Sequence, residues 1–140
     1  MIQRQQTLWL LLAIAAAIAC FMFPFVVGET SGADGNTPVR ATIDAGSSFL
    51  LLLCTGASLV LSALTIFLYK NRQQQTWLCL GGILLTLVIF LLFIREMNKL
   101  SKPVLALSAV LPLIMLISYF LALRGIRKDE KLVKSLDKLR

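Results

Sequence analysis

Few residues in this sequence have the types or the spacing needed for chemistry. The chain has no histidine, and its long apolar runs contain no acidic or basic side chain. Haem ligation by paired histidines is therefore excluded, and a proton relay through buried carboxylates has no candidate residue. The sequence predicts no catalytic residue, no metal site and no cofactor.

The three cysteines are the remaining candidates for chemistry within the apolar runs. Cys20, Cys54 and Cys79 lie in three different runs and form no C-x-x-C pair. A quinone-linked disulfide oxidase is therefore a poor fit. Buried free cysteine packs like a small apolar residue, so we expect a structural role.

The acidic residues between the first two apolar runs could in principle serve a hydrolase or a transferase. Glu29, Asp34 and Asp44 lie in a segment rich in glycine, serine and threonine. A flexible connector would not hold them as a nucleophile–base pair or a metal set. We therefore predict that the protein is not an enzyme.

The elements that must position any site are apolar and long. The chain has 140 residues, of which 58% are hydrophobic and 15% are charged, whereas a soluble domain has about 25% charged residues. A helix needs about 20 residues to cross about 30 Å of hydrocarbon. Four uncharged runs meet this length, at residues 7–27, 48–69, 76–94 and 103–123. We predict an all-α integral membrane four-helix bundle.

Two segments allow alternatives. The first run could be a signal peptide cleaved at Cys20, but it exceeds a signal core in length and stays apolar after the cysteine. We expect it to be retained as a span. The outer loop 28–47 contains TPVRATI, whose weak strand character favours a hairpin, while its glycine and aspartate favour a solvated connector. We favour the connector.

Proline and glycine predict the shape of the fourth span. Pro103 is expected to begin the helix, where its missing N–H costs nothing. Pro112 lies mid-run and is expected to kink the helix. Gly125 follows the run and offers a place to bend away from the span axis.

Small and hydroxyl residues repeat at helical spacing within the second span. Cys54, Ser58 and Ser62 form such a line, which lets helices pack closely. The functional alternative is a polar pore lined by Ser58, Ser62 and Thr65. We favour packing, because the same residues serve a four-helix bundle.

Basic residues orient the spans. With the N-terminus inside, ten of the 14 Lys and Arg residues lie on the inner side and four on the outer side. The loop with Arg95, Lys99 and Lys102 opposes this assignment, but the total favours two cytoplasmic termini. The aromatic residues near the span ends, where rings favour the lipid–water interface, are Trp9, Tyr69 and Trp77.

Residues 124–140 are predicted to form a basic amphipathic cytoplasmic helix. The apolar side carries Ile126, Leu132, Val133, Leu136 and Leu139. The basic side carries Arg127, Lys131, Lys134 and Lys138. Glu130 can pair with Lys134 at i, i+4.

Three kinds of binding partner are candidates for this tail. It can lie on the bilayer with its bases near anionic lipid headgroups. Its leucines can instead dock on another membrane protein or on a second copy of the chain. Nucleic acid is not expected, because the tail has no aromatic platforms.

Three segments carry a family resemblance. MIQRQQTLWLLLA, YKNRQQQTWLC and RGIRKDEKLVKSLDKLR resemble a family of small four-span membrane proteins of Bacteroidetes-type bacteria, described as a domain of unknown function. The resemblance implies a bacterial inner-membrane location and no activity. Matching residues are Gln3, Arg4, Lys70, Asn71, Arg72, Lys128, Asp129, Glu130, Asp137 and Arg140.

These matching residues all fall on the cytoplasmic side, and we expect them to form one surface. We hypothesise that Asp129, Glu130 or Asp137 pairs with Arg4 or Arg72. The function expected from the whole sequence is a non-enzymatic accessory or scaffold subunit of a membrane protein complex. A small oligomeric transporter or channel is the alternative.

Overall fold

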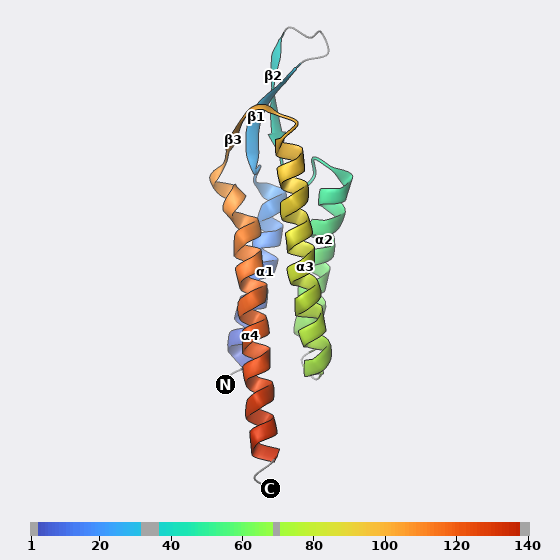
Figure 1. The fold of residues 1–140 in the computed structure, drawn as a ribbon, viewed down its shortest axis with the longest axis vertical. Coiled ribbons are helices and arrows are strands. Elements are labelled where there is room, and N and C mark those ends of the chain that lie inside the picture. Colours follow the sequence, from blue (N-terminus) through green and yellow to red (C-terminus); the bar gives the residue numbers. More distant parts are fainter. Residues whose placement is uncertain (1–2, 32–36, 69–70, 138–140) are drawn as a thin grey trace.

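The protein is an elongated bundle of four helices with a small sheet at one end (Figure 1). The computed structural model describes residues 3–31, 37–68 and 71–137. The helices are α1 (Gln3–Met22), α2 (Phe49–Phe67), α3 (Arg72–Met97) and α4 (Leu111–Asp137), with the short 3₁₀ helix η1 (Leu107–Val110) before α4. The strands are β1 (Val26–Ser31), β2 (Pro38–Ile43) and β3 (Ser101–Leu105).

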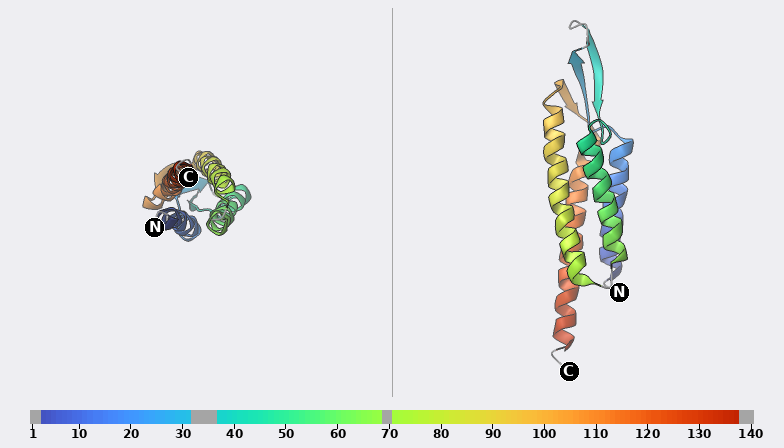
Figure 2. Two further views of the ribbon diagram at one scale, coloured as in Figure 1. Left: turned by 90° about the horizontal axis from the view of Figure 1, so that it is seen from below. Right: turned by 90° about the vertical axis from the view of Figure 1, so that its right-hand side faces the viewer.

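The four helices alternate in direction and surround a common interior. Each packs against its neighbours in sequence, and α1 closes the ring against α4 (Figure 2). We call the end with the strands the sheet end, and the end where α1 begins and α4 ends the terminal end. The predicted all-α class is confirmed, with four helices long and apolar enough to cross a membrane.

The second helix shows an inverted distribution of polarity. Its buried residues include Thr55, Ser58, Ser62 and Thr65, whereas its exposed residues are mainly large and apolar. The exposed set is Phe49, Leu50, Leu52, Leu53, Val60, Leu64 and Phe67. A water-soluble bundle would bury these side chains. A polar stripe facing inward and an apolar exterior fit a helix that packs within lipid.

The outer loop forms a hairpin, so the preference for a solvated connector was wrong. Antiparallel β1 and β2 pair from Val26–Ile43 to Ser31–Pro38. The strand β3, which the sequence did not predict, comes from the loop after α3 and pairs with the other edge of β1. Pro103 lies in this edge strand and does not begin a helix. An edge strand tolerates proline because one of its sides needs no ladder donor.

The fourth helix differs from its predicted shape at two positions. Pro112 lies in the first turn of α4, where a missing N–H costs nothing, so it does not kink a span. Gly125 lies inside α4, which continues without interruption to Asp137 and extends beyond the other helices (Figure 1). The expected bend at Gly125 was therefore wrong.

Candidate functional site

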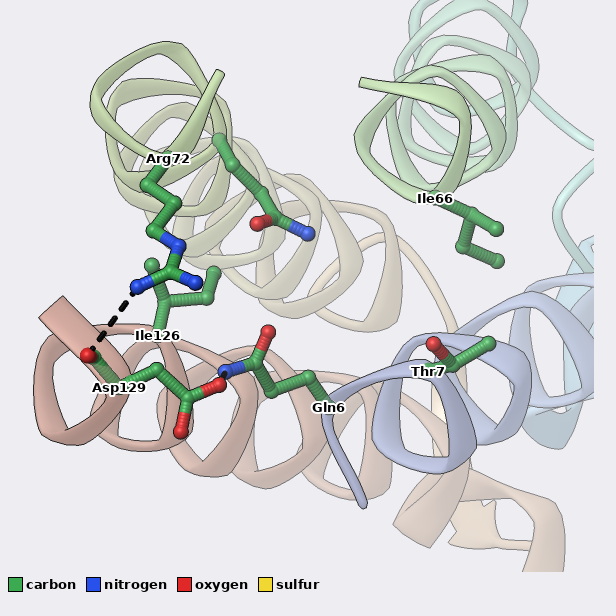
Figure 3. A pocket seen from close by; sticks show the side chains of 7 residues that line it. Gln6, Thr7, Ile66, Arg72, Ile126 and Asp129 are labelled. Carbon is green, nitrogen blue, oxygen red and sulfur yellow. Dashed lines mark hydrogen bonds between the residues drawn. The ribbon is translucent and has the colours of Figure 1, made fainter. Parts of the chain in front are cut away.

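A polar cavity of about 180 Å³ lies at the terminal end of the bundle. All four helices contribute to it. Its lining residues are Gln6, Thr7, Ile66, Arg72, Gln75, Ile126 and Asp129 (Figure 3). The cavity thus lies between the starts of α1 and α3, the end of α2, and the part of α4 where the basic tail begins.

Asp129 is the acidic residue of this cavity. It is 8% exposed, although Lys128 beside it is exposed. Its Oδ2 accepts a hydrogen bond from Nε2 of Gln6, and its Oδ1 has no partner among the described residues. An unpaired buried oxygen costs about 1–3 kcal/mol. Stability alone therefore does not account for a carboxylate at this position.

Arg72 approaches Asp129 from the start of α3. Its Nη1 donates to the backbone carbonyl oxygen of Asp129 at 3.1 Å (Figure 3). The hypothesis that Arg72 pairs with an acidic side chain was therefore wrong for Asp129, since that carboxylate binds Gln6. Arg72 instead holds the α4 backbone, a contact that does not depend on the side chain at position 129.

Glu130 and Arg72 interact electrostatically but form no ion pair. The Glu130 carboxylate forms the predicted ion pair with Lys134, at 2.7 Å. The other two residues of the pairing hypothesis, Arg4 and Asp137, lie outside the residues whose side chains the structure describes, so their pairing stays a prediction.

Two further contacts fix the helices around the cavity. Nε2 of Gln75 donates to the backbone carbonyl of Thr65 at 3.2 Å, which joins α3 to α2. Gly125 lets α4 approach α1 closely, because a Cβ there would lie 2.9 Å from Cγ of Gln6. Gly125 therefore serves close helix packing, within an α4 that continues through it without interruption.

The other predicted surface residues divide into three groups. The exposed ones are Asn71, Arg127, Lys128, Lys131, Leu132, Val133 and Lys134. Lys70, Lys138, Leu139 and Arg140 lie outside the described residues, and Gln3 and Leu136 are described as backbone in α1 and α4. The structure brings Arg72 and Asp129 together, but it does not place the exposed tail bases in the cavity.

The predicted apolar side of the tail is split. Ile126 is 1% exposed and packs in the bundle core with Leu10, Ala122 and Leu123. Leu132 and Val133 are each 42% exposed. The part of α4 after Asp129 therefore projects with uncovered apolar side chains.

A central hydrogen-bond network is built around Tyr119. Its hydroxyl donates to the carbonyl of Ser58 at 2.8 Å and bonds the Ser62 hydroxyl. Tyr119 thus reaches from α4 to α2 across the bundle. Its ring packs where Gly82 of α3 leaves room, since a Cβ at Gly82 would lie 2.5 Å from the ring. The ring occupies the interior beside the proposed pore-lining serines.

The hydroxyl groups along α2 are mostly bonded to their own helix. Ser58 donates to the carbonyl of Thr55, Ser62 to that of Ser58, and Thr65 to that of Leu61. Oγ1 of Thr55 has no partner among the described residues. This pattern agrees with the packing interpretation of the α2 line.

Gln6, Gln75 and Tyr119 are site residues that were not predicted from the sequence. The glutamines belong to the similar segments QRQQT and RQQQT, each at the start of a span. A polar aromatic residue in the middle of an apolar run was the signal for Tyr119. Neither signal named the partner, because each partner lies on another helix.

The described part of the chain has no group of three or more metal-binding side chains. Cys20 and Cys79 are buried and Cys54 is half-buried, and none is in a disulfide. The Sγ of Cys20 lies 3.9 Å from Sδ of Met115. The cysteines thus lie in packed, apolar surroundings.

Comparison with known protein families identifies the family of this chain. The family model described as Domain of unknown function (DUF4293) matches residues 2–139. The chain belongs to this family. The expected membership of a family described as a domain of unknown function is therefore confirmed. No curated protein and no solved structure matches the chain.

Proposed function

We propose that the protein is a non-enzymatic accessory or scaffold subunit of a membrane protein complex. The observation that carries this proposal is the extension of α4. The helix continues to Asp137 beyond the bundle, and it exposes Leu132 and Val133 together with basic side chains. A rigid projecting helix with an uncovered apolar side suits docking on another protein.

The terminal cavity supports the same role. Gln6 binds the Asp129 carboxylate, Arg72 binds the Asp129 carbonyl, and Gly125 allows α1 to pack closely. These contacts come from two other helices and fix the direction of α4 where it leaves the bundle. A helix held in this way loses less conformational entropy when a partner binds it.

We place the protein in the bacterial inner membrane, with both termini in the cytoplasm. The apolar exterior of the bundle and the exposed rings of Trp9 and Trp77 near the terminal end support a bilayer location. The excess of Lys and Arg at the terminal end supports the orientation. The bacterial origin rests on the resemblance described above.

The partner that we propose for the tail is another membrane protein or a second copy of the chain. The alternative is that the tail lies on the bilayer and binds its anionic headgroups. The direction of α4 favours the protein, because the helix does not turn where the span ends. The described part of the tail has no aromatic side chain on which a base could stack, so we do not propose nucleic acid as a partner.

The transporter or channel takes second place among the functions that we consider. Its support is the line of hydroxyl groups on the buried side of α2. Tyr119 and its bonds to Ser58 and Ser62 occupy the same interior. Transport would thus require an assembly of several copies.

The test is co-purification with a matched pair of variants. The tagged protein is extracted from its own membranes in mild detergent and measured by native mass spectrometry. The tail variant carries Leu132→Ser and Val133→Ser. The control carries Val104→Ser and Leu107→Ser, which remove exposed apolar side chains at the sheet end.

A stoichiometric partner present with the wild type and the control, but lost from the tail variant, supports the proposal. A homo-oligomer that persists unchanged in both variants, with no other protein bound, overturns it and favours transport.

A further inference from the structure

A groove of about 400 Å³ lies on the outer side of α4 near the terminal end. Phe120, Leu123, Arg124, Arg127, Lys128 and Lys131 line it. Its four basic side chains are exposed. Asp129, by contrast, points to the opposite side of the helix, where it contacts Gln6. The groove is therefore separate from the terminal cavity.

The bases of this groove form no ion pair among the described residues, although the Glu130 carboxylate, which is ion-paired with Lys134, also interacts electrostatically with Arg127. The ion pairs among the described residues are Glu96–Lys99 and Glu130–Lys134, and neither involves a groove residue. Four like charges on adjacent turns repel one another. The groove is therefore complementary to an anion, and best to one that carries more than one negative charge.

An apolar stripe leads into the groove along the same helix. Leu113, Ile117 and Phe120 are 45%, 55% and 59% exposed. They recur every three or four residues, so they share one face of α4, and Arg124 continues that face on the next turn. A ligand that matches the whole face must be apolar along the bundle and anionic at its terminal end.

We propose that this face of α4 binds one anionic phospholipid. Its phosphate lies among Arg124, Arg127, Lys128 and Lys131, and an acyl chain lies along Ile117 and Phe120. Basic pockets at the cytoplasmic ends of membrane helices suit such headgroups. This site rests on the membrane location given above, but it does not depend on the partner of the tail.

The test uses delipidated protein in detergent and measures lipid binding by native mass spectrometry. The probes are phosphatidylglycerol, cardiolipin and phosphatidylcholine. The groove variant carries Arg124→Gln and Lys128→Gln. The control variant carries Arg40→Gln and Lys102→Gln, which remove the same charge at the sheet end, where both bases are exposed.

Wild type and control are expected to bind one anionic lipid, with cardiolipin bound more tightly than phosphatidylglycerol. The groove variant is expected to bind each about thirtyfold more weakly, because two bases near the headgroup are lost. Phosphatidylcholine is expected to bind no better than detergent. Equal losses in the two variants, or equal binding of phosphatidylcholine, would overturn the site.

Two further measurements keep the test decisive. If the double groove variant does not fold, Lys131→Gln replaces it and is expected to weaken binding about fivefold. Inorganic phosphate is added as a competitor. Displacement of the lipid by millimolar phosphate would mean that the acyl chain contributes nothing, which contradicts the proposed pose. Co-purification of the protein partner from native membranes is measured for the same variants, so loss of lipid and loss of partner are distinguished.

Discussion

The two ends of the bundle are closed by different kinds of bonds. At the sheet end, β1 pairs with β2 and β3 through backbone hydrogen bonds. At the terminal end, side chains join the helices: Gln6 binds Asp129, Arg72 binds the α4 backbone, and Gln75 binds the α2 backbone. Backbone pairing is available to most residue types, whereas side-chain bonds need particular ones. The terminal end should therefore be the more sensitive to substitution.

The largest effect on the free energy of unfolding is expected at Gly125, where α4 packs closely against α1. Gly125→Leu would force α4 away from Gln6, and we expect a loss of about 2–3 kcal/mol in the free energy of unfolding. Gly56→Leu is the control, because a Cβ at Gly56 meets nothing within 4 Å. Reversible unfolding in sodium dodecyl sulfate, followed by tryptophan fluorescence, measures both. Equal effects would contradict the close-packing role of Gly125.

The next effect concerns the buried carboxylate. Asp129→Ala leaves the Gln6 amide without its acceptor, so we expect a loss of about 2 kcal/mol in the same assay. Asp129→Asn keeps an oxygen that accepts this bond, and we expect a loss below about 1 kcal/mol. If alanine and asparagine behave alike, the Gln6–Asp129 bond does not stabilise the terminal end.

A smaller effect is expected from the α3–α4 contact. Arg72→Gln should cost about 1 kcal/mol, because one hydrogen bond to a carbonyl is lost. Since that carbonyl survives any substitution at position 129, a double-mutant cycle with Asp129→Asn should give a coupling below about 0.5 kcal/mol. For the same reason, combining Arg72→Asp with Asp129→Arg should not restore stability. A rescue would mean that the two side chains pair directly.

The smallest effect is expected at the sheet end. Val104→Thr exchanges one strand-forming residue for another at an exposed position of β3. The backbone bonds to β1 remain, so we expect a change within about 0.5 kcal/mol. Thermal unfolding in detergent measures it beside Gly125→Leu. A loss as large as that of Gly125→Leu would show that the two ends do not differ as described.

Several features were predictable because they depend on local sequence. The four long apolar helices follow from uncharged runs of sufficient length. The Glu130–Lys134 pair follows from helical spacing alone. The span limits were less accurate, because Val26 and Val27 read as helix but belong to β1. Apolar β-branched residues suit either structure, and pairing with β2 decides between them.

Other features could not be read from the chain because they depend on distant segments. The strand β3 exists through pairing with β1, and no local pattern specifies that partner. The same limit applies to Gly125, which has the sequence character of a hinge. In the folded chain Gly125 lies against Gln6 of α1, and its lack of a side chain allows the two helices to pack closely.

The sequence by itself determined the four long apolar helices, the lack of histidine, the basic tail and the membership of the family. Composition and helical periodicity are local properties of the sequence. A long apolar segment in hydrocarbon must satisfy its backbone N–H and C=O groups internally, which an α-helix does. The tertiary structure alone decided that Asp129 is buried beside Gln6, that Tyr119 crosses the bundle, and that α4 runs straight past Gly125. Each of these depends on contacts between helices, and their energies arise only when the chain has folded.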